Sequence, residues 1–146
     1  VIERAKKLQI DYKIVTKDEL YNGSILNCIN SLNPELIILA GFLLKFPIEI
    51  IDVYNKKIVN IHPALLPKYG GKGMYGMNVH KAIIKNKEAV SGITIHYVNK
   101  KYDEGPIIFQ KEIKINPSYT PNDLANKIHD LEMEYFPKIV ENLLTL

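Results

Sequence analysis

The sequence predicts an α/β protein built on a doubly wound, mostly parallel sheet. Two continuous apolar runs, at residues 36–40 and 58–61, are typical of strands that are buried on both faces. Segments with helical apolar spacing separate these runs, as expected of parallel strands joined by crossover helices. Residues 90–98 and 107–115 alternate apolar and polar positions around a turn, which predicts an antiparallel hairpin on the C-terminal side.

The first third of the chain predicts helices around one short strand. Residues 1–9 have the pattern of an amphipathic helix, and residues 12–15 that of a strand. A second helix is expected over residues 17–31, with acidic residues in its first turn that complement the helix dipole. The stretch 21–24 interrupts this pattern, and Ser24 is expected to cap the renewed helix.

Three further helices are expected between and after the strands. Pro47 begins one that runs to about Tyr54, and residues 78–85 form another. The last helix starts with Thr120 as N-cap and Pro121 in the first turn, and Pro137 is expected to kink it. Its buried stripe is expected to consist of Leu124, Ile128, Leu131, Tyr135, Ile139 and Leu143.

Composition bounds the class of protein. A chain of 146 residues predicts a single domain, residues 1–146, with 47% hydrophobic and 24% charged residues as in ordinary globular proteins. No apolar run approaches the roughly 20 residues of a membrane helix, and no signal-peptide pattern is present. The single cysteine, Cys28, fits a core-facing helix position and a cytoplasmic protein. A net charge of +3 from scattered lysines argues against nucleic-acid binding.

The end of the run at 58–61 carries the candidate chemistry. Asn60 and His62 are two residues apart, so they project to the same side of an extended backbone. Pro63 disfavours the helical region for His62, so the strand is expected to end there. Open α/β sheets bind ligands at the carboxyl ends of their strands. A satisfied polar pair without a reaction is the alternative that this spacing leaves open.

A glycine-rich loop follows at residues 70–77. It lacks the Gly-Lys-Ser/Thr ending of a P-loop, so its composition does not indicate nucleotide binding. We interpret it as a mobile flap over the site, with Met74, Tyr75 and Met77 as its apolar face. A passive surface insertion is the alternative.

The segment NIHPALLPKY at residues 60–69 resembles the signature of the folate-dependent formyltransferases. LAGF at 39–42, GITIHYV at 92–98 and YDEGP at 102–106 match the same family in the same order. The resemblance covers essentially the whole chain and implies the Rossmann-like fold of that family. It also implies that the first βαβ elements, roughly 40 residues with a loop for the substrate phosphate, precede residue 1.

The resemblance implies transfer of a formyl group from 10-formyltetrahydrofolate to the amine of glycinamide ribonucleotide (GAR) in purine (IMP) biosynthesis. This reaction needs a donor for the developing oxyanion, an imidazole for proton transfer and a carboxylate that tunes it. Asn60, His62 and Asp103 match these roles in family order, with Asp103 expected to raise the pKa of His62. No metal is implied, because the histidines lack metal-ligand spacing.

The binding residues are likewise implied by the resemblance. The family pairs the pterin of the folate with the backbone after Phe42 and with the turn at 99–103, and it binds the ribose side of GAR on the last helix. The expected folate-binding residues are Leu43, Leu44, Lys45, Phe46, Asn60, Asn99, Lys100, Lys101, Tyr102 and Asp103. The expected GAR-binding residues, His129 and Glu132, are three apart on one helix face. A solvated helix face is the alternative for Glu132.

Other members of the family share the amide, the imidazole and the carboxylate. Methionyl-tRNA formyltransferase usually shows Arg-Gly where this chain has residues 68–71, and formyltetrahydrofolate deformylase shows His-His in place of His62-Pro63. Both remain alternatives, as does a fragment that binds folate without catalysis. The expected partners are the small molecules GAR and formylfolate, without nucleic acid or membrane, and the oligomeric state, monomer or dimer, stays open.

Overall fold

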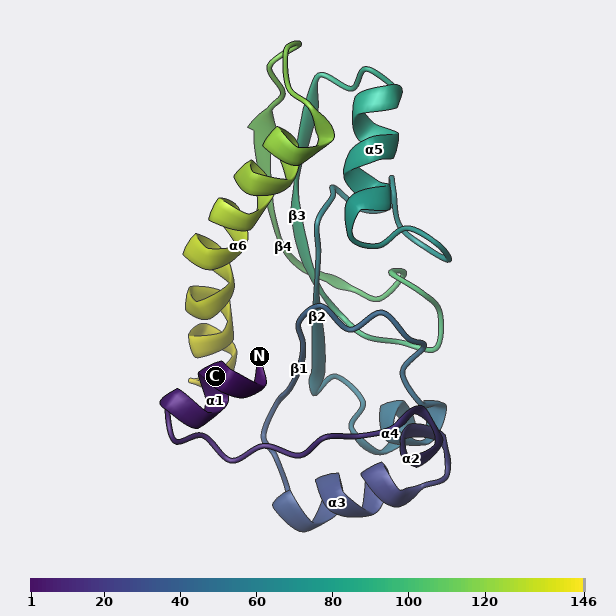
Figure 1. Ribbon diagram of the computed structural model, residues 1–146. Helices are drawn as coiled ribbons and strands as arrows, with labels where there is room; N and C mark the ends of the chain where they lie inside the picture. The colour runs from purple at the N-terminus through teal and green to yellow at the C-terminus, as the bar shows by residue number, and fades with distance from the viewer. Residues whose placement is uncertain (146) are drawn as a thin grey trace. The chain divides into compact units, whose positions relative to one another are not determined.

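The computed structural model describes residues 1–145, so Leu146, the last residue of the predicted domain, lies outside the described residues. The described chain divides into two compact units, Val1–Pro34 and Glu35–Leu146. Figure 1 shows the elements of both units along the chain. The single domain over residues 1–146 therefore stays a prediction.

The first unit is helical. Its elements are α1 (Ile2–Lys7), α2 (Lys17–Tyr21) and α3 (Ser24–Leu32). Thr16 caps α2 through a capping box, because its hydroxyl accepts from the Glu19 N–H while the Glu19 carboxylate accepts from the Thr16 N–H at 2.8 Å. The predicted break between α2 and α3 is confirmed, but the N-cap of α3 is Gly23, not Ser24. Gly23 has φ +86°, which glycine adopts without steric cost, so Ser24 becomes the first helical residue.

The strand predicted at residues 12–15 is wrong, because this stretch has irregular backbone. A strand persists only when a neighbour completes its hydrogen bonds. The sheet of the described residues contains no strand from this part of the chain. Residues 12–15 therefore have the side-chain pattern of a strand, but they do not pair with a neighbouring strand of the described sheet.

The second unit contains a four-stranded sheet in the order β1-β2-β3-β4. Its strands are β1 (Ile37–Leu39), β2 (Ile58–His62), β3 (Val90–Tyr97) and β4 (Ile107–Lys114). β1 and β2 pair in parallel, whereas β2–β3 and β3–β4 are antiparallel. The α/β class and the hairpin are confirmed. Within the described residues the sheet is mixed, with fewer parallel pairs than the prediction assigned, because an apolar run reports burial and not strand direction.

Helices flank this sheet. They are α4 (Ile48–Val53) between β1 and β2, α5 (Met77–Lys85) between β2 and β3, and α6 (Pro121–Leu144) after β4. Ile50 and Ile51 of α4 are buried. α6 begins at the predicted N-cap, where Thr120 and Asp123 form a capping box, and it continues through Pro137. Among the described residues, no helix combines the length and the apolarity needed to cross a bilayer.

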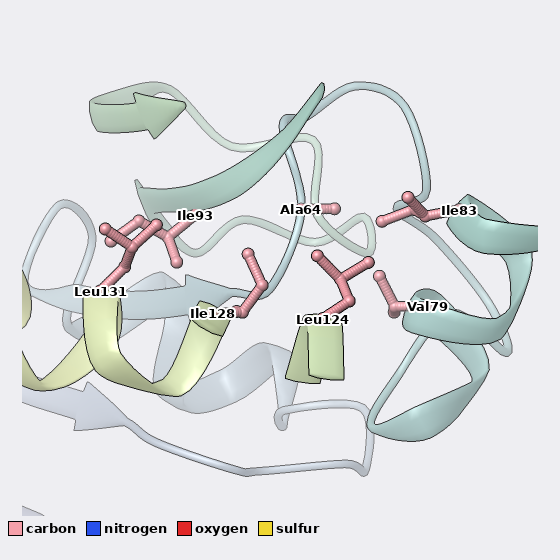
Figure 2. Packing of buried hydrophobic residues seen from close by; sticks show 7 residues of the cluster. All are labelled: Ala64, Val79, Ile83, Ile93, Leu124, Ile128 and Leu131. Carbon is pink, nitrogen blue, oxygen red and sulfur yellow. The ribbon is translucent and has the colours of Figure 1, made fainter. Parts of the chain in front are cut away.

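The core of the second unit joins α5 and α6 to the sheet. Its buried residues are Ala64, Val79, Ile83, Ile93, Leu124, Ile128 and Leu131. Figure 2 shows Leu124 of α6 pointing toward Val79 and Ile83 of α5. The predicted stripe of α6 is therefore buried in its first half, whereas Tyr135, Ile139 and Leu143 are only partly buried. This packing holds both helices near the carboxyl end of β2, where the candidate site lies.

Candidate active site

The three predicted catalytic side chains come together at one end of the sheet. Asn60 and His62 leave β2 on the same side, as the two-residue period requires. Asp103 lies on the turn between β3 and β4, and its backbone has φ +54°. Asp103 Oδ1 is 3.7 Å from His62 Nδ1. The turn therefore brings a carboxylate to an imidazole that is 41 residues earlier in the chain.

Asp103 is held by backbone and by two imidazole rings. Its Oδ2 accepts a hydrogen bond from the Gly71 N–H at 2.8 Å, and its Oδ1 is also 3.7 Å from His96 Nε2. A Cβ on Gly70 would collide with the Leu66 side chain and press on Asp103, so glycine permits this close approach. Burial raises the pKa of Asp103, whereas the contacts with His96, His62 and Gly71 lower it. The lowering is larger in sum, so the net pKa lies below the ordinary value.

His62 is buried, and its ring is fixed from two sides. Nε2 lies 2.7 Å from the Tyr69 carbonyl oxygen, and Nδ1 faces Asp103. Burial lowers the pKa of His62, Asp103 and the Tyr69 carbonyl raise it, and the His96 ring lowers it. The net pKa is below the ordinary value. Asp103 raises the pKa of His62 as expected, and the larger effect of burial explains why the net pKa is nevertheless lowered.

Asn60 is oriented by a histidine on the neighbouring strand. His96 lies opposite Asn60 in the β2–β3 register, and Asn60 Nδ2 is 3.1 Å from His96 Nε2. His96 Nδ1 lies 2.9 Å from the Tyr97 carbonyl, which only accepts, so Nδ1 carries a proton. The contacts of its ring with Tyr97 and Asn60 therefore orient the Asn60 side chain.

A cavity of about 800 Å³ opens beside these groups. Its size suits a small organic ligand, for which sites of about 300–1,000 Å³ are common. All predicted site residues line it, namely Leu43, Leu44, Lys45, Phe46, Asn60, His62, Asn99, Lys100, Lys101, Tyr102, Asp103, His129 and Glu132. The walls also include residues 71–76 of the glycine-rich loop and one face of α6.

A family model described as "Formyl transferase" matches residues 2–140. The chain belongs to the formyl transferase family. It is 35% identical over 151 aligned positions to phosphoribosylglycinamide formyltransferase of Bacillus subtilis, an alignment that covers 100% of this chain and 75% of that relative. It is 37% identical over 123 residues to the chloroplastic phosphoribosylglycinamide formyltransferase of Arabidopsis thaliana, covering 84% of this chain but only 42% of that relative.

Solved structures agree with this family. The crystal structure of phosphoribosylglycinamide formyltransferase from Bacillus halodurans matches with a TM-score of 0.87 at 30% identity, over 99% of this chain and 74% of that one. The chain thus spans less than half of the Arabidopsis relative and about three quarters of the two Bacillus proteins.

In this formyl transferase, the predicted folate-binding residues form two irregular segments on opposite sides of Asn60 in sequence. Residues 43–46 follow β1 without regular secondary structure, and Phe46 is buried there. The turn at 99–103 is pinned by the Asn99 side chain, which donates to the Glu104 carbonyl at 3.1 Å and accepts from the Lys101 N–H at 2.9 Å. Lys100 is tied to Asp52 of α4 at 2.8 Å.

The predicted GAR-binding pair lies on α6, on the cavity wall. His129 Nδ1 and Glu132 Oε2 are 3.5 Å apart. Burial raises the pKa of Glu132, while the hydrogen bond and the charge interaction with His129 lower it, and the net pKa is above the ordinary value. The pair is positioned to meet the same cavity as His62.

Two residues of the site had no role assigned from the sequence. The β2–β3 register that places His96 against Asn60 cannot be predicted from the sequence of one strand. His80 of α5 is buried beside the cavity, and burial and the His62 ring lower its pKa. Within residues 1–145, no group of three or more His, Cys, Asp or Glu side chains is arranged to hold a metal ion.

Proposed function

We propose that this formyl transferase moves the formyl group of 10-formyltetrahydrofolate to the amine of GAR, giving formyl-GAR and tetrahydrofolate in purine (IMP) biosynthesis. The observation that carries the proposal is the meeting of Asn60, His62 and Asp103 at the wall of one cavity, with 3.7 Å between His62 Nδ1 and Asp103 Oδ1. The names of the relatives support GAR as the acceptor.

The lining of the cavity fits a folate as formyl donor. Residues 43–46 and 99–103 offer irregular backbone around an apolar space, which suits recognition of a flat heterocycle through main-chain groups. The bound folate supplies the formyl group. In this proposal its binding residues are Leu43, Leu44, Lys45, Phe46, Asn60, Asn99, Lys100, Lys101, Tyr102 and Asp103.

Asn60 is assigned the oxyanion. Attack by an amine on a formyl carbon places negative charge on the formyl oxygen, and a preoriented neutral donor stabilises that charge without reorganising. The 3.1 Å contact between Asn60 Nδ2 and His96 Nε2 holds the amide in one orientation. Loss of one such donor typically costs about 3–4 kcal/mol in the transition state.

His62 is assigned the proton transfer, and Asp103 its tuning. Because burial lowers the pKa of His62, the ring is neutral near pH 7 and Nδ1 can take the proton that the attacking amine loses. The imidazolium so formed is stabilised by the Asp103 carboxylate, which stays ionised because its own pKa is lowered. His62 then donates this proton to the leaving nitrogen, so no covalent enzyme intermediate is needed.

His129 and Glu132 are assigned to the ribose side of GAR. A carboxylate accepts hydrogen bonds from ribose hydroxyls, and the neighbouring imidazole adds a donor on the same helix face. A cytoplasmic location and partners limited to small molecules belong to the same proposal. The mild net charge of +3 and the single cysteine support them.

A substrate panel tests the proposal. The full chain is incubated with 10-formyltetrahydrofolate and, in turn, GAR, initiator methionyl-tRNA or water alone, and release of tetrahydrofolate is followed together with the formylated product. We expect formyl-GAR as the main product. Preferential formylation of the tRNA, release of formate, or folate binding without turnover would each replace GAR transfer by one of the alternatives.

A further inference from the structure

The loop after β2 folds back so that Tyr69 touches His62 through its backbone. The Tyr69 carbonyl oxygen is 2.7 Å from His62 Nε2. A carbonyl only accepts, so Nε2 must carry a hydrogen, and Nδ1 is left as the nitrogen that gains or loses a proton. The position of this one carbonyl therefore decides the tautomer of the neutral ring: Nε2 holds the hydrogen, and Nδ1, which faces Asp103, holds the lone pair.

The backbone of Tyr69 is not in a conformation that it would adopt by itself. Its φ is +57°, in the left-handed region that a bulky residue occupies only when its surroundings hold it there. Without such support the peptide would relax, and the carbonyl would turn away from His62.

The side chain of Tyr69 supplies that support from outside the cavity. Its hydroxyl donates to Glu88 Oε1 at 2.8 Å and accepts from Asn86 Nδ2 at 2.9 Å. Both partners directly follow α5, and the ring packs against the buried core cluster. The Lys68 ammonium is 3.3 Å from Glu88 Oε1. The hydrogen bonds from Tyr69 and Lys68 lower the pKa of Glu88, so the acceptor is a carboxylate at neutral pH.

We propose that Tyr69 is a positioning residue for His62, and that Glu88 and Asn86 act through its hydroxyl to keep the Tyr69 carbonyl on His62 Nε2. The inference rests on the proposed function for its kinetic consequence, because it assigns Nδ1 as the proton-carrying atom in formyl transfer. It reaches beyond that function by assigning a role to residues that do not line the cavity, since Asn86 and Glu88 stand at the far end of the tyrosine ring.

The first measurement does not depend on any reaction. Nitrogen-15 NMR of the imidazole distinguishes a protonated Nε2 from a protonated Nδ1. We expect His62 in the wild type to be the Nε2–H tautomer, and Tyr69→Phe to show a mixture of both. Glu88→Ala is expected to match Tyr69→Phe, whereas Glu88→Gln, which keeps an acceptor oxygen, should stay close to the wild type.

The second measurement uses formyl transfer to GAR. Tyr69→Phe should lower kcat about 5- to 30-fold and leave KM for both substrates within about twofold, because the change acts on proton transfer and not on binding. Combining Tyr69→Phe with Glu88→Ala should add little, since both break one chain of contacts. Tyr119→Phe, which removes the hydroxyl of another half-buried loop tyrosine, serves as the matched control and should not change kcat.

The outcomes separate cleanly. If the wild type does not formylate GAR but Tyr69→Phe still shifts the His62 tautomer, the positioning role holds and the proposed function fails. An unchanged tautomer and unchanged kcat in Tyr69→Phe would overturn the inference, whatever the substrate. Should Tyr69→Phe not fold, Asn86→Ala and Glu88→Ala test the same chain from its other end, and wild-type behaviour in both would overturn it.

Discussion

The histidine–carboxylate pairs His62–Asp103 and His129–Glu132 at the cavity are nearly equal in length but lie in very different surroundings. His62 and Asp103 are 3.7 Å apart, with side chains 5% and 15% exposed. His129 and Glu132 are 3.5 Å apart, with side chains 69% and 29% exposed. An exposed pair is screened by water and contributes roughly 0.2–1 kcal/mol. The two pairs therefore differ not in distance but in burial and in the hydrogen bonds around them.

The comparison also explains the different roles that we assign. The Tyr69 carbonyl, the Gly71 N–H and the His96 ring contact the buried pair and hold its side chains in place. Groups that are already held in place stabilise the charge of a transition state without first having to reorganise. The pair on α6 keeps side-chain freedom and access to solvent, which suits contacts to a substrate that enters and leaves.

The largest expected effect comes from removing the buried imidazole. His62→Ala should lower kcat for formyl transfer to GAR by at least about 10²-fold, because it removes the group that carries the proton. Steady-state kinetics with formylfolate measures this, with circular dichroism as the check on folding. Wild-type turnover in a folded His62→Ala protein would contradict the assigned role.

A second effect of similar origin separates charge from shape at the buried pair. Asp103→Asn keeps the size of the side chain and an acceptor oxygen for the Gly71 N–H, but it removes the negative charge that stabilises imidazolium. We expect a loss in kcat of about 10²-fold with little change in melting temperature. A Glu104→Gln control removes an exposed carboxylate from the same turn. Equal losses in the two variants would mean that the turn, and not the carboxylate, matters.

A smaller effect is expected at the exposed pair. Glu132→Gln should raise KM for GAR by about 3- to 10-fold while kcat stays within about twofold, because the contact holds substrate equally in the ground and transition states. His129→Ala should act in the same direction and more weakly. A fall in kcat as large as that of Asp103→Asn would erase the distinction between the two pairs.

The smallest effect concerns stability against pH. The pKa of folded His62 lies below its value in an unfolded chain, so between these two values the unfolded state binds more protons. The free energy of unfolding should therefore fall as the pH drops below about 6.5 and level off below the folded pKa. The same holds for His80, whose pKa is also lowered by burial. Denaturant melts of the wild type and of His62→Asn test this, and equal slopes would exclude a contribution from His62.

Much of the site was predictable because it depends on local geometry and recognisable motifs. Asn60 and His62 share a face by the period of a strand, and Pro63 follows the end of β2 as expected. The Thr120 cap and the Leu124, Ile128 and Leu131 stripe of α6 follow from capping chemistry and helical spacing. The antiparallel β2–β3 pairing, the loss of the strand at 12–15 and the partnership of Asn60 with His96 were missed, because each depends on which strands lie side by side.

The direction of the pKa shift of His62 likewise depends on both the sequence motif and the tertiary packing. The family motif implies that Asp103 raises the pKa of His62, and it does, but the net pKa also depends on how much water remains around the ring. Desolvation is a property of the packed second unit, in which His62 is only 4% exposed.

The sequence by itself determined the α/β class, the end of β2 at which Asn60 and His62 lie, and the choice of Asn60, His62 and Asp103 as the candidate site residues. These follow from periodicity, from proline and capping rules and from family motifs, all of which act over a few residues. Only the tertiary structure decided three features. These are the strand register that places His96 against Asn60, the burial that lowers the pKa of His62, and the contact of the Tyr69 carbonyl with the His62 ring. Such features arise where segments distant in sequence exclude water together, and no local pattern encodes that exclusion.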